Sequence, residues 1–337
     1  MSKQFEPLLE VNNLRSYFPS TGGVVKAVND VSFKIGKGEI VALVGESGSG
    51  KSVTALSIMG LNAPTITYGK ESIISFKGHN LLTMKKRQMK KIRGNEISMI
   101  FQDPLSSLNP LHPIGKQIAE PIQLHQGVSY KTAQQTVINL LNKVGIPDAE
   151  SRLRDYPHQL SGGMRQRIMI AMALACNPSL LIADEPTTAL DVTIQAQILN
   201  VMKSLQRETG VSILLITHDL GVVAEMADRV LVMYCGKIVE EGDVYSIFQD
   251  PKHPYTKGLL ASVPKLRGQS KKRLNAIPGT VPSPLELTGG CNFYSRCSQA
   301  NDQCSSNTPY LENLGPQRRA ACWNLQERPI EEVTKHA

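Results

Sequence analysis

The sequence predicts an α/β fold built around a buried parallel sheet, and three short apolar runs predict it. Residues 39–44, 179–183 and 212–217 have the length and composition of strands that are covered on both faces. Each run is followed at once by glycine-rich or polar residues. Ligands of open α/β sheets bind outside the carboxyl ends of the strands, so we expect the functional residues at these three junctions.

The first junction carries the pattern G-x-x-x-x-G-K-S, and a helical segment follows it at 52–59. Glycines let successive backbone N–H groups curl round a phosphate, and the helix N-terminus adds partial positive charge. The alternative is a Gly/Ser-rich loop that only caps a helix, but the strand before it and the helix after it favour phosphate binding. We expect Lys51 to reach the terminal phosphates and the Ser52 hydroxyl to bind Mg²⁺. The predicted nucleotide-binding residues here are Gly45, Ser47, Gly48, Ser49, Gly50, Lys51, Ser52 and Val53.

The second junction places two carboxylates, Asp184 and Glu185, directly after the strand at 179–183. We expect Asp184 to bind Mg²⁺, directly or through water, and Glu185 to polarise an attacking water molecule. Adjacent acids at a strand end can instead cap the following helix. The phosphate loop upstream makes the catalytic interpretation the stronger one.

Two further polar side chains end apolar runs. His218 follows the strand at 212–217 and is predicted to contact the γ-phosphate, although a single histidine is more often structural. Gln102 follows the run 97–101 and can point its amide towards Mg²⁺ and the attacking water. The alternative for Gln102 is a loop amide bonded to the backbone.

Composition limits the class of protein. The chain has 337 residues, 41% of them apolar, without a continuous apolar run of about 18 residues that could span a bilayer. Its first residues lack the apolar core of a signal peptide, so we expect a cytoplasmic protein. The net charge is +8, and the basic run 85–93 is interpreted as a solvated helix face rather than a nucleic-acid or anionic-membrane contact.

Two other regions surround the predicted parallel sheet. Short strands at 8–18 and 24–35 suit an antiparallel sheet, in which Phe18 either stacks on an adenine ring or is plain strand core. Residues 109–160 read as helices, with candidates at 114–125 and 129–144. The sequence Leu160-Ser161-Gly162-Gly163-Met164 then opens a further helix, with Ser161 as its predicted N-cap and an N-terminus open to an anion or simply capped.

Together these stretches resemble the nucleotide-binding subunit of an ATP-binding-cassette (ABC) transporter over about the first 250 residues. The resemblance joins the phosphate loop, Gln102, the signature 160–164, the acidic pair at 184–185, the turn Ala189-Leu190-Asp191 and His218, in that order. It implies a P-loop NTPase (RecA-like) cassette in residues 1–250, with an antiparallel β subdomain and a helical subdomain at about 103–176. A loop-rich C-terminal extension would occupy 251–337.

A narrower resemblance points to the dipeptide and oligopeptide importer ATPases. It rests on Phe101-Gln102-Asp103-Pro104, Tyr156-Pro157-His158-Gln159-Leu160, the stretch 183–192 and His253-Pro254-Tyr255-Thr256. It implies two transmembrane permease subunits, an extracellular or periplasmic peptide-binding protein and a place on the cytoplasmic face of the membrane, with no nucleic-acid partner. Another importer substrate, such as nickel or an antimicrobial peptide, stays open. A non-transport cassette ATPase of DNA repair or translation is disfavoured, because only one cassette and no sustained heptads are present.

The family also implies how the chemistry is divided. Two cassettes pack head to tail with ATP between them, and the family favours a related second chain over a copy. Lys51, Ser52, Gln102, Asp184, Glu185 and His218 would serve the ATP site on this chain. The signature residues Ser161, Gly162 and Gly163 would serve the partner's site, and Asp191 would lie between the two.

The C-terminal region is rich in proline and contains Cys291, Cys297, Cys304 and Cys322, spaced C-x5-C-x6-C-x17-C. Four thiolates can hold a metal centre that staples a region with little core. The C-x2-C knuckle typical of zinc sites is missing, and the importer tails that this region resembles include members with a [4Fe–4S] cluster. We predict such a cluster, with Arg296, Arg318 and Arg319 beside it. Zinc, or thiols that are unligated or oxidised, are the alternatives.

Overall fold

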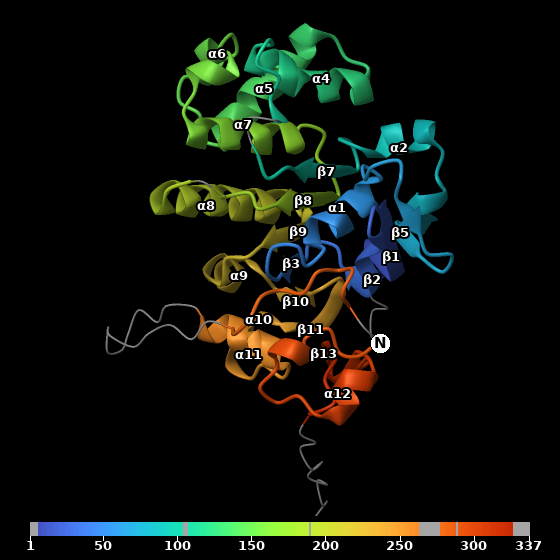
Figure 1. Cartoon of the computed structure of the whole chain (residues 1–337). Coiled ribbons are helices and arrows are strands. Elements are labelled where there is room, and N and C mark those ends of the chain that lie inside the picture. The colour runs from blue at the N-terminus through green and yellow to red at the C-terminus, as the bar shows by residue number, and fades with distance from the viewer. Residues whose placement is uncertain (1–5, 104–106, 189, 263–276, 288, 326–337) are drawn as a thin grey trace, which may run out of the picture.

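The computed structural model describes residues 6–103, 107–188, 190–262, 277–287 and 289–325, and its core is one large β-sheet (Figure 1). Neighbouring strands from β10 to β7 are parallel, and β11 closes on β10 as an antiparallel hairpin. In spatial order the sheet consists of β12 (Glu312–Gly315), β13 (Arg318–Ala320), β11 (Lys237–Asp243), β10 (Arg229–Tyr234), β3 (Ile40–Val44), β9 (Ser212–Thr217), β8 (Leu180–Asp184) and β7 (Ile97–Ile100).

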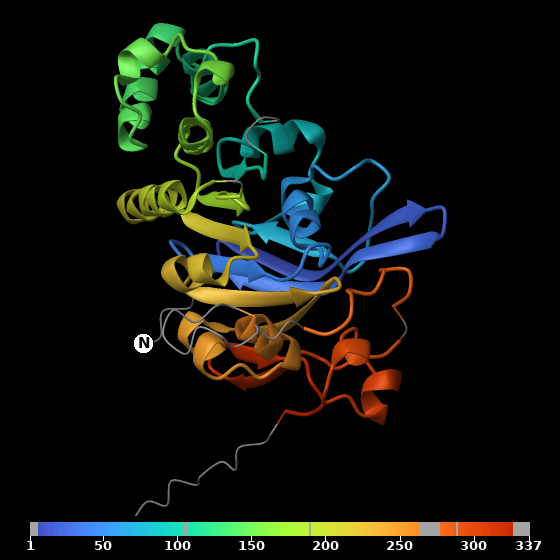
Figure 2. The same cartoon turned by 60° about the vertical axis from the view of Figure 1, so that its left-hand side comes forward.

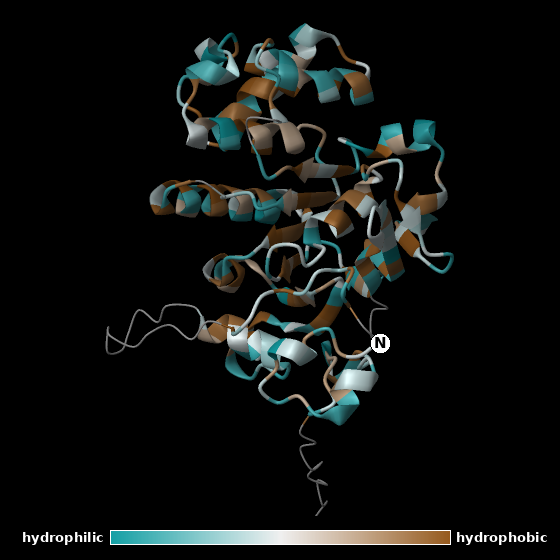
Figure 3. Ribbon diagram, in the orientation of Figure 1, coloured by the Kyte–Doolittle hydropathy of each residue, from teal (hydrophilic) through white to brown (hydrophobic). Residues whose placement is uncertain are grey.

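The central strands are buried along their whole length. Every residue of β3, β8 and β9 is buried, as expected for a parallel sheet that is covered on both faces. Figure 3 shows these strands as the brown interior of the molecule, while the outer helices carry most of the teal. The predicted α/β class and its three apolar strands are therefore confirmed. Helices that follow these strands are α1 (Lys51–Met59), α8 (Val192–Thr209) and α9 (Leu220–Met226).

A smaller antiparallel sheet packs beside the first and confirms the predicted β subdomain. Its long hairpin of β1 and β2 projects clearly in Figure 2. Apolar side chains from both sheets and α1 form one cluster, which includes Leu9, Phe33, Leu43 and Ile58. The hydrophobic effect thus fixes this sheet against the start of α1. Its strands are β1 (Leu9–Ser20), β2 (Gly23–Ile35), β4 (Thr67–Tyr68), β5 (Ile73–Phe76) and β6 (His79–Asn80).

The helical region lies at the far end of the sheet from the C-terminal residues (Figure 1). Its helices share a core with α8 and with the neighbouring strands β7 and β8, and this core includes Ile118, Val137, Ile168 and Ile198. The predicted helices at 114–125 and 129–144 end within a few residues of the observed ones. The helices are α4 (Ile114–Gln126), α5 (Tyr130–Lys143), α6 (Ala149–Arg152) and α7 (Gly162–Ala173).

The basic run 85–93 contributes α2 (Lys86–Ile92), of which only Met89 is buried. The other side chains of α2 are exposed or half-buried. In the part of the chain that the structure describes, none of the helices combines the length and apolarity needed to cross a bilayer.

The C-terminal residues join the core of the cassette. β13 pairs with β11, and the Ala321 N–H donates to the Val239 carbonyl at 2.8 Å. Tyr255 and Phe293 belong to the same apolar cluster as Val44 at the end of β3. The extension therefore obtains its hydrophobic burial from the cassette. The last helix of the cassette is α10 (Val244–Gln249), and the helices of the extension are α11 (Pro254–Ala261) and α12 (Asp302–Ser306).

His253 caps α11 and gives this junction a pH dependence. It is 2% exposed, its Nδ1 accepts the Tyr255 N–H at 3.0 Å, and burial lowers its pKa to about 3. The unfolded chain binds a proton near pH 6.5 and the folded chain does not, so stability falls as pH drops from about 6.5 towards 3. We expect a loss of about 2 kcal/mol between pH 6.5 and pH 5 from this residue.

The matched variant is His253→Asn, which keeps an N-capping acceptor but cannot ionise in this range. Denaturant unfolding at pH 7 and pH 5 should show a smaller loss for the variant than for the wild type. Equal losses in the two proteins would contradict a buried, neutral His253.

Candidate ATP site

The phosphate loop needs glycine at two of its positions for reasons of space. A Cβ at Gly45 would lie 2.1 Å from the Met233 carbonyl oxygen, and one at Gly50 would lie 2.3 Å from that of Ala27. Both glycines have positive φ, +155° and +104°. No side chain caps the start of α1 and no acid lies in its first turn. The backbone therefore leaves a helix N-terminus open to an anion.

Lys51 lies inside this loop. It is 6% exposed, and its ammonium donates to the Gly45 carbonyl at 2.8 Å and the Glu46 carbonyl at 3.0 Å. Burial lowers the pKa of Lys51, while Glu185 and Asp184 act in the opposite direction. The lysine is thus a desolvated cation whose hydrogen bonds, among the described residues, go to carbonyl groups, which suits it to an anionic ligand.

Asp184 is the last residue of β8, and it lies beside Ser52, the second residue of α1. It is 4% exposed, and its Oδ1 has no hydrogen-bond partner among the described residues. Burial raises the pKa of Asp184, and the nearby Ser52 side chain opposes this shift. A buried carboxylate oxygen without a partner next to a hydroxyl group is a donor set that fits Mg²⁺.

Glu185 receives three hydrogen bonds from three different segments. Its partners are Gln102 Nε2 at 3.0 Å, Thr188 Oγ1 at 2.9 Å and His218 Nδ1 at 3.1 Å. Burial acts to raise the pKa of Glu185, but the hydrogen bonds from Thr188 and His218 outweigh it, and the pKa lies below its usual value. The backbone of Glu185 is left-handed, with φ of +48°. The carboxylate is therefore ionised at neutral pH and fixed in direction.

The residues predicted at the strand ends are thus brought together. Gln102, Asp184 and His218 follow β7, β8 and β9, which are neighbours in the sheet. The Gln102 amide bonds to Glu185 rather than to the backbone. Sequence reasoning missed Thr188, whose only signal is its place three residues after Glu185.

The signature residues form a second group. Ser161 caps α7 by accepting the Met164 N–H at 3.3 Å, and Asp191 caps α8 by accepting the Ile194 N–H at 2.9 Å. A Cβ at Gly163 would lie 2.8 Å from Ile194, so this glycine lets the starts of the two helices approach. Ser161, Gly162 and Asp191 are exposed, and among the described residues no hydrogen bond joins them to the phosphate loop.

Val53 and Phe18, the other two predicted nucleotide contacts, have ordinary half-buried positions. Val53 lies in the first turn of α1 and is half-buried. Phe18 is half-buried in β1 opposite Val25 of β2. Ala189 of the predicted turn lies outside the described residues.

The predicted iron–sulfur cluster is wrong. Among the residues that the structure describes, no group of three or more His, Cys, Asp or Glu side chains could hold a metal ion, which also leaves zinc without support. The four cysteines do line one pocket, but its volume is about 10 Å³, room for one water molecule at most. Burial raises the pKa of Cys291 to about 11 and also raises the pKa of Cys297 and Cys322.

The arginines that were expected beside such a cluster bind carboxylates instead. Each of the three forms an ion pair with an acid of the cassette or of its last helix, so none of them faces an anionic centre. The pairs are Arg296 with Glu46, Arg318 with Asp250 and Arg319 with Glu241. The spacing of the cysteines and the resemblance to importer tails had supported the prediction, and neither reports the volume of the pocket or the protonation of the thiols. Outside the pocket, Cys235 is 4% exposed and packs in the apolar core.

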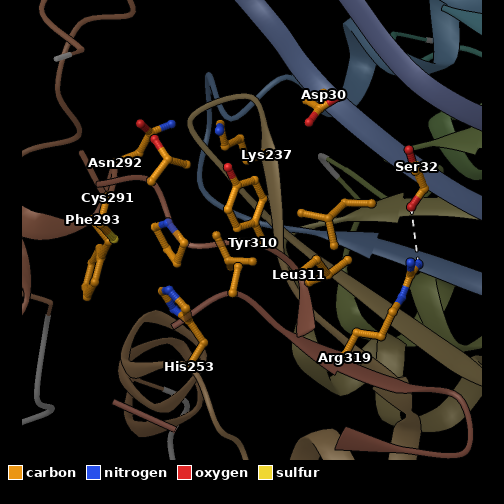
Figure 4. Close-up of a pocket in the computed structure, with 15 residues that line it drawn as sticks. Asp30, Ser32, Lys237, His253, Cys291, Asn292, Phe293, Tyr310, Leu311 and Arg319 are labelled. Atoms are coloured by element: carbon orange, nitrogen blue, oxygen red, sulfur yellow. Dashed lines mark hydrogen bonds between the residues drawn. The ribbon is translucent and has the colours of Figure 1, made fainter. Parts of the chain in front are cut away.

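A larger cavity of about 380 Å³ lies between β2, β11 and the C-terminal extension (Figure 4). Lys237, Tyr310 and Asp30 face it, and Phe293 and His253 form its wall on the side of the extension. It is separate from the phosphate loop, none of whose residues line it. The cavity shows that the extension covers the sheet edge incompletely.

Known proteins share this arrangement. The family described as "ABC transporter" matches residues 28–188, and the family described as "Oligopeptide/dipeptide transporter, C-terminal region" matches residues 239–304. The chain is similar to the oligopeptide transport ATP-binding protein AppD of Bacillus subtilis (strain 168), with 53% identity over 96% of this chain and 99% of that protein. It is 48% identical to the dipeptide transport ATP-binding protein DppD of Escherichia coli (strain K12), over 94% and 96% of the two chains.

Solved structures of ABC cassettes are similar in fold to this chain. The ATP-binding cassette MJ0796, in a dimeric post-hydrolysis state bound to ADP and Pi, has a TM-score of 0.63 at 27% identity over 70% of this chain and 98% of that chain. The cbiO1 protein of Clostridium perfringens, part of the ABC transporter complex cbiONQ, has a TM-score of 0.61 at 26% identity over 73% and 92%. With a relative above half identity along nearly its whole length, the chain belongs to the ABC transporter family, within its group of peptide-transport ATP-binding proteins.

Proposed function

We propose that this chain binds and hydrolyses ATP, and that Glu185 activates the attacking water. The observation that carries the proposal is the fixed, ionised Glu185 carboxylate beside a buried Lys51 and an open helix N-terminus. The phosphate loop and Lys51 would bind the phosphates, and the His218 ring would hold Glu185 in direction while remaining exposed to the ligand. Catalysis of phosphoryl transfer rests mainly on such positioning and on charge stabilisation.

Mg²⁺ fits the site through Ser52, Asp184 and Gln102. The orphaned Asp184 Oδ1 supports this assignment, because a buried oxygen without a partner is otherwise costly. When bound, the ion would supply charge neutralisation at the phosphates. Ser52 is close enough to Asp184 to oppose the rise in its pKa, so the two proposed ligands lie side by side.

The ATP site is completed, in this proposal, by a second cassette that is a related chain. Ser161, Gly162 and Gly163 would face the partner's phosphates and Asp191 would lie between the two sites. The exposed N-terminus of α7, whose first turn contains no acidic residue, supports this. The dimeric state of the similar cassette MJ0796 is consistent with it.

The substrate we propose is a peptide, imported through two permease subunits that receive it from a peptide-binding protein. This chain would lie on the cytoplasmic face of the membrane. The similarity to the peptide transport proteins AppD and DppD and the match of the C-terminal family support a peptide substrate. Exposed Leu111 and Leu124, 79% and 73% accessible, lie at the helical region where a permease helix would dock. A related importer substrate, such as nickel or an antimicrobial peptide, is the second candidate.

Uptake of a labelled dipeptide and of ⁶³Ni²⁺ into vesicles that contain the full transporter tests the substrate. ATP-dependent uptake of the dipeptide alone is the expected result. Uptake of nickel alone would support the second candidate, and uptake of neither, with ATP hydrolysis intact, would overturn the peptide assignment.

The division of the two ATP sites gives a separate prediction. In a transporter with two different cassettes, Ser161→Arg on this chain should inactivate the partner's site, because the arginine side chain would block the N-terminus of α7. Lys51→Met should inactivate the site on this chain. Photolabelling of each cassette with 8-azido-ATP should show the loss on opposite chains. Loss on the same chain for both variants would contradict the head-to-tail arrangement.

A further inference from the structure

The C-terminal extension touches the phosphate loop directly. Arg296, which lies in a short 3₁₀ turn at Tyr294–Arg296, binds Glu46 with both arms of its guanidinium. The distances are 2.7 Å from Nη1 to Oε2 and 3.0 Å from Nη2 to Oε1. The Arg296 side chain is 4% exposed, and its partner is the second residue of the loop. A parallel two-bond pair of this kind fixes direction as well as charge.

A second contact from the extension fixes the backbone of the same residue. The Glu46 N–H donates to the Tyr255 hydroxyl at 2.8 Å, and Tyr255 is fully buried. Its ring packs against Tyr234 and Phe293, with centroids 4.6 Å and 5.5 Å away. Glu46 is thus held through its side chain and its backbone by two segments of the extension.

Arg296 is itself immobilised. Its Nε donates to the Pro278 carbonyl at 3.0 Å and its Nη1 reaches the Tyr234 hydroxyl at 3.3 Å. The guanidinium also lies over the rings of Tyr234 and Phe293, at 5.8 Å and 6.0 Å from their centroids. With these partners the arginine has little freedom to leave Glu46.

The contact between Arg296 and Glu46 is also connected to Lys51, the lysine proposed to bind the phosphates. Lys51 donates to the Glu46 carbonyl, so one residue connects Arg296 and Tyr255 on one side with the ammonium on the other. The cavity beside this contact, about 370 Å³, is lined by Gly45, Glu46, His218 and Arg296. The extension therefore borders the ATP site itself.

Charge explains why the arginine matters there. A carboxylate in a loop that must receive a polyphosphate repels the ligand, and partial burial strengthens this repulsion. Glu46 has 29% of its side chain exposed, and Arg296 is the cation paired with it in the described structure. The ion pair neutralises the carboxylate of Glu46, so the ammonium of Lys51 stays available to the ligand.

We propose that Arg296 is a positioning residue of the ATP site, through which the C-terminal extension neutralises Glu46 and holds the phosphate loop ready for nucleotide. The proposal rests on the ATP binding proposed above. It assigns the extension a part in nucleotide affinity, beyond its packing role at the sheet edge.

The experiment compares affinities of the full chain for a fluorescent ATP analogue and for the corresponding AMP analogue. Arg296→Met leaves Glu46 charged and should weaken ATP binding by about 10-fold or more, and AMP binding less. Glu46→Gln in the Arg296→Met background should restore much of the loss, because the repelling charge is removed. Arg296→Lys, which keeps the charge without the fork, should fall between the wild type and Arg296→Met.

The matched control is Arg318→Met, which breaks another ion pair of the extension, with Asp250, away from the phosphate loop. Circular dichroism checks that each variant is folded. If Arg296→Met does not fold, Arg296→Lys provides the test. The proposal is overturned if Arg296→Met or Arg296→Lys binds ATP as tightly as Arg318→Met, or if Glu46→Gln brings no recovery. A wild-type chain that binds no ATP would instead overturn the proposed function.

Discussion

Replacement of Glu185 by glutamine is expected to lower the rate of ATP hydrolysis by about 10²–10³-fold while ATP affinity stays within a few-fold of the wild type. The carboxylate is held by Gln102, Thr188 and His218, and its lowered pKa keeps it ionised at neutral pH. Glutamine has the same shape, so the loop and the phosphate contacts stay in place. What is lost is the negative charge that polarises the water. Single-turnover hydrolysis of radiolabelled ATP measures the first effect and equilibrium binding the second.

Glu208→Gln is the control for this variant. It makes the same chemical change at a half-exposed surface acid that pairs with Lys143 at 3.1 Å. Exposed pairs contribute about 0–1 kcal/mol to stability, so this variant should hydrolyse ATP like the wild type. Undiminished hydrolysis by Glu185→Gln would remove Glu185 from the role assigned to it.

The second large effect is expected at Gly45. A Cβ at this position would lie 2.1 Å from the backbone carbonyl of Met233, and the φ of +155° is strained for any other residue. Gly45→Ala must therefore push the phosphate loop away from β10. Because the Gly45 carbonyl also accepts from Lys51, the shift displaces the ammonium. We expect ATP affinity to fall by roughly 100-fold or more, about 2.7 kcal/mol.

Gly210→Ala separates the clash from backbone strain. Gly210 caps the end of α8 with φ of +69°, and a Cβ there would meet nothing within 4 Å. This variant should lose about 1 kcal/mol of stability and keep its ATP affinity. Isothermal calorimetry with MgATP, together with thermal unfolding, distinguishes the two. Equal ATP affinity in Gly45→Ala and Gly210→Ala would show that the loop tolerates the methyl group.

The parts of the fold that sequence predicted well depend on local patterns. The apolar runs that became β3, β8 and β9 and the phosphate loop between β3 and α1 are contiguous in the chain. The helices α4 and α5 were also predictable, because Ser129 and Gly127 mark their ends by capping. Neighbouring parallel strands then bring Gln102, Asp184 and His218 to one edge without further information.

What sequence could not provide are contacts made across long stretches of chain. No pattern indicates that β13 adds to β11, or that Arg296 binds Glu46. The incorrect prediction of a metal centre has the same cause, because it too depended on how distant residues pack. Cysteine spacing does not report that the space between the thiols is about 10 Å³ or that burial keeps the Cys291 thiol protonated.

The pair between Glu46 and Arg296 joins residues that lie 250 positions apart. During synthesis, β3 and α1 leave the ribosome long before Arg296 does, so a nascent chain carries a phosphate loop whose carboxylate has no counter-ion. The order of translation thereby delays the finished nucleotide pocket until the last segment has emerged, and a prematurely terminated polypeptide stays without it.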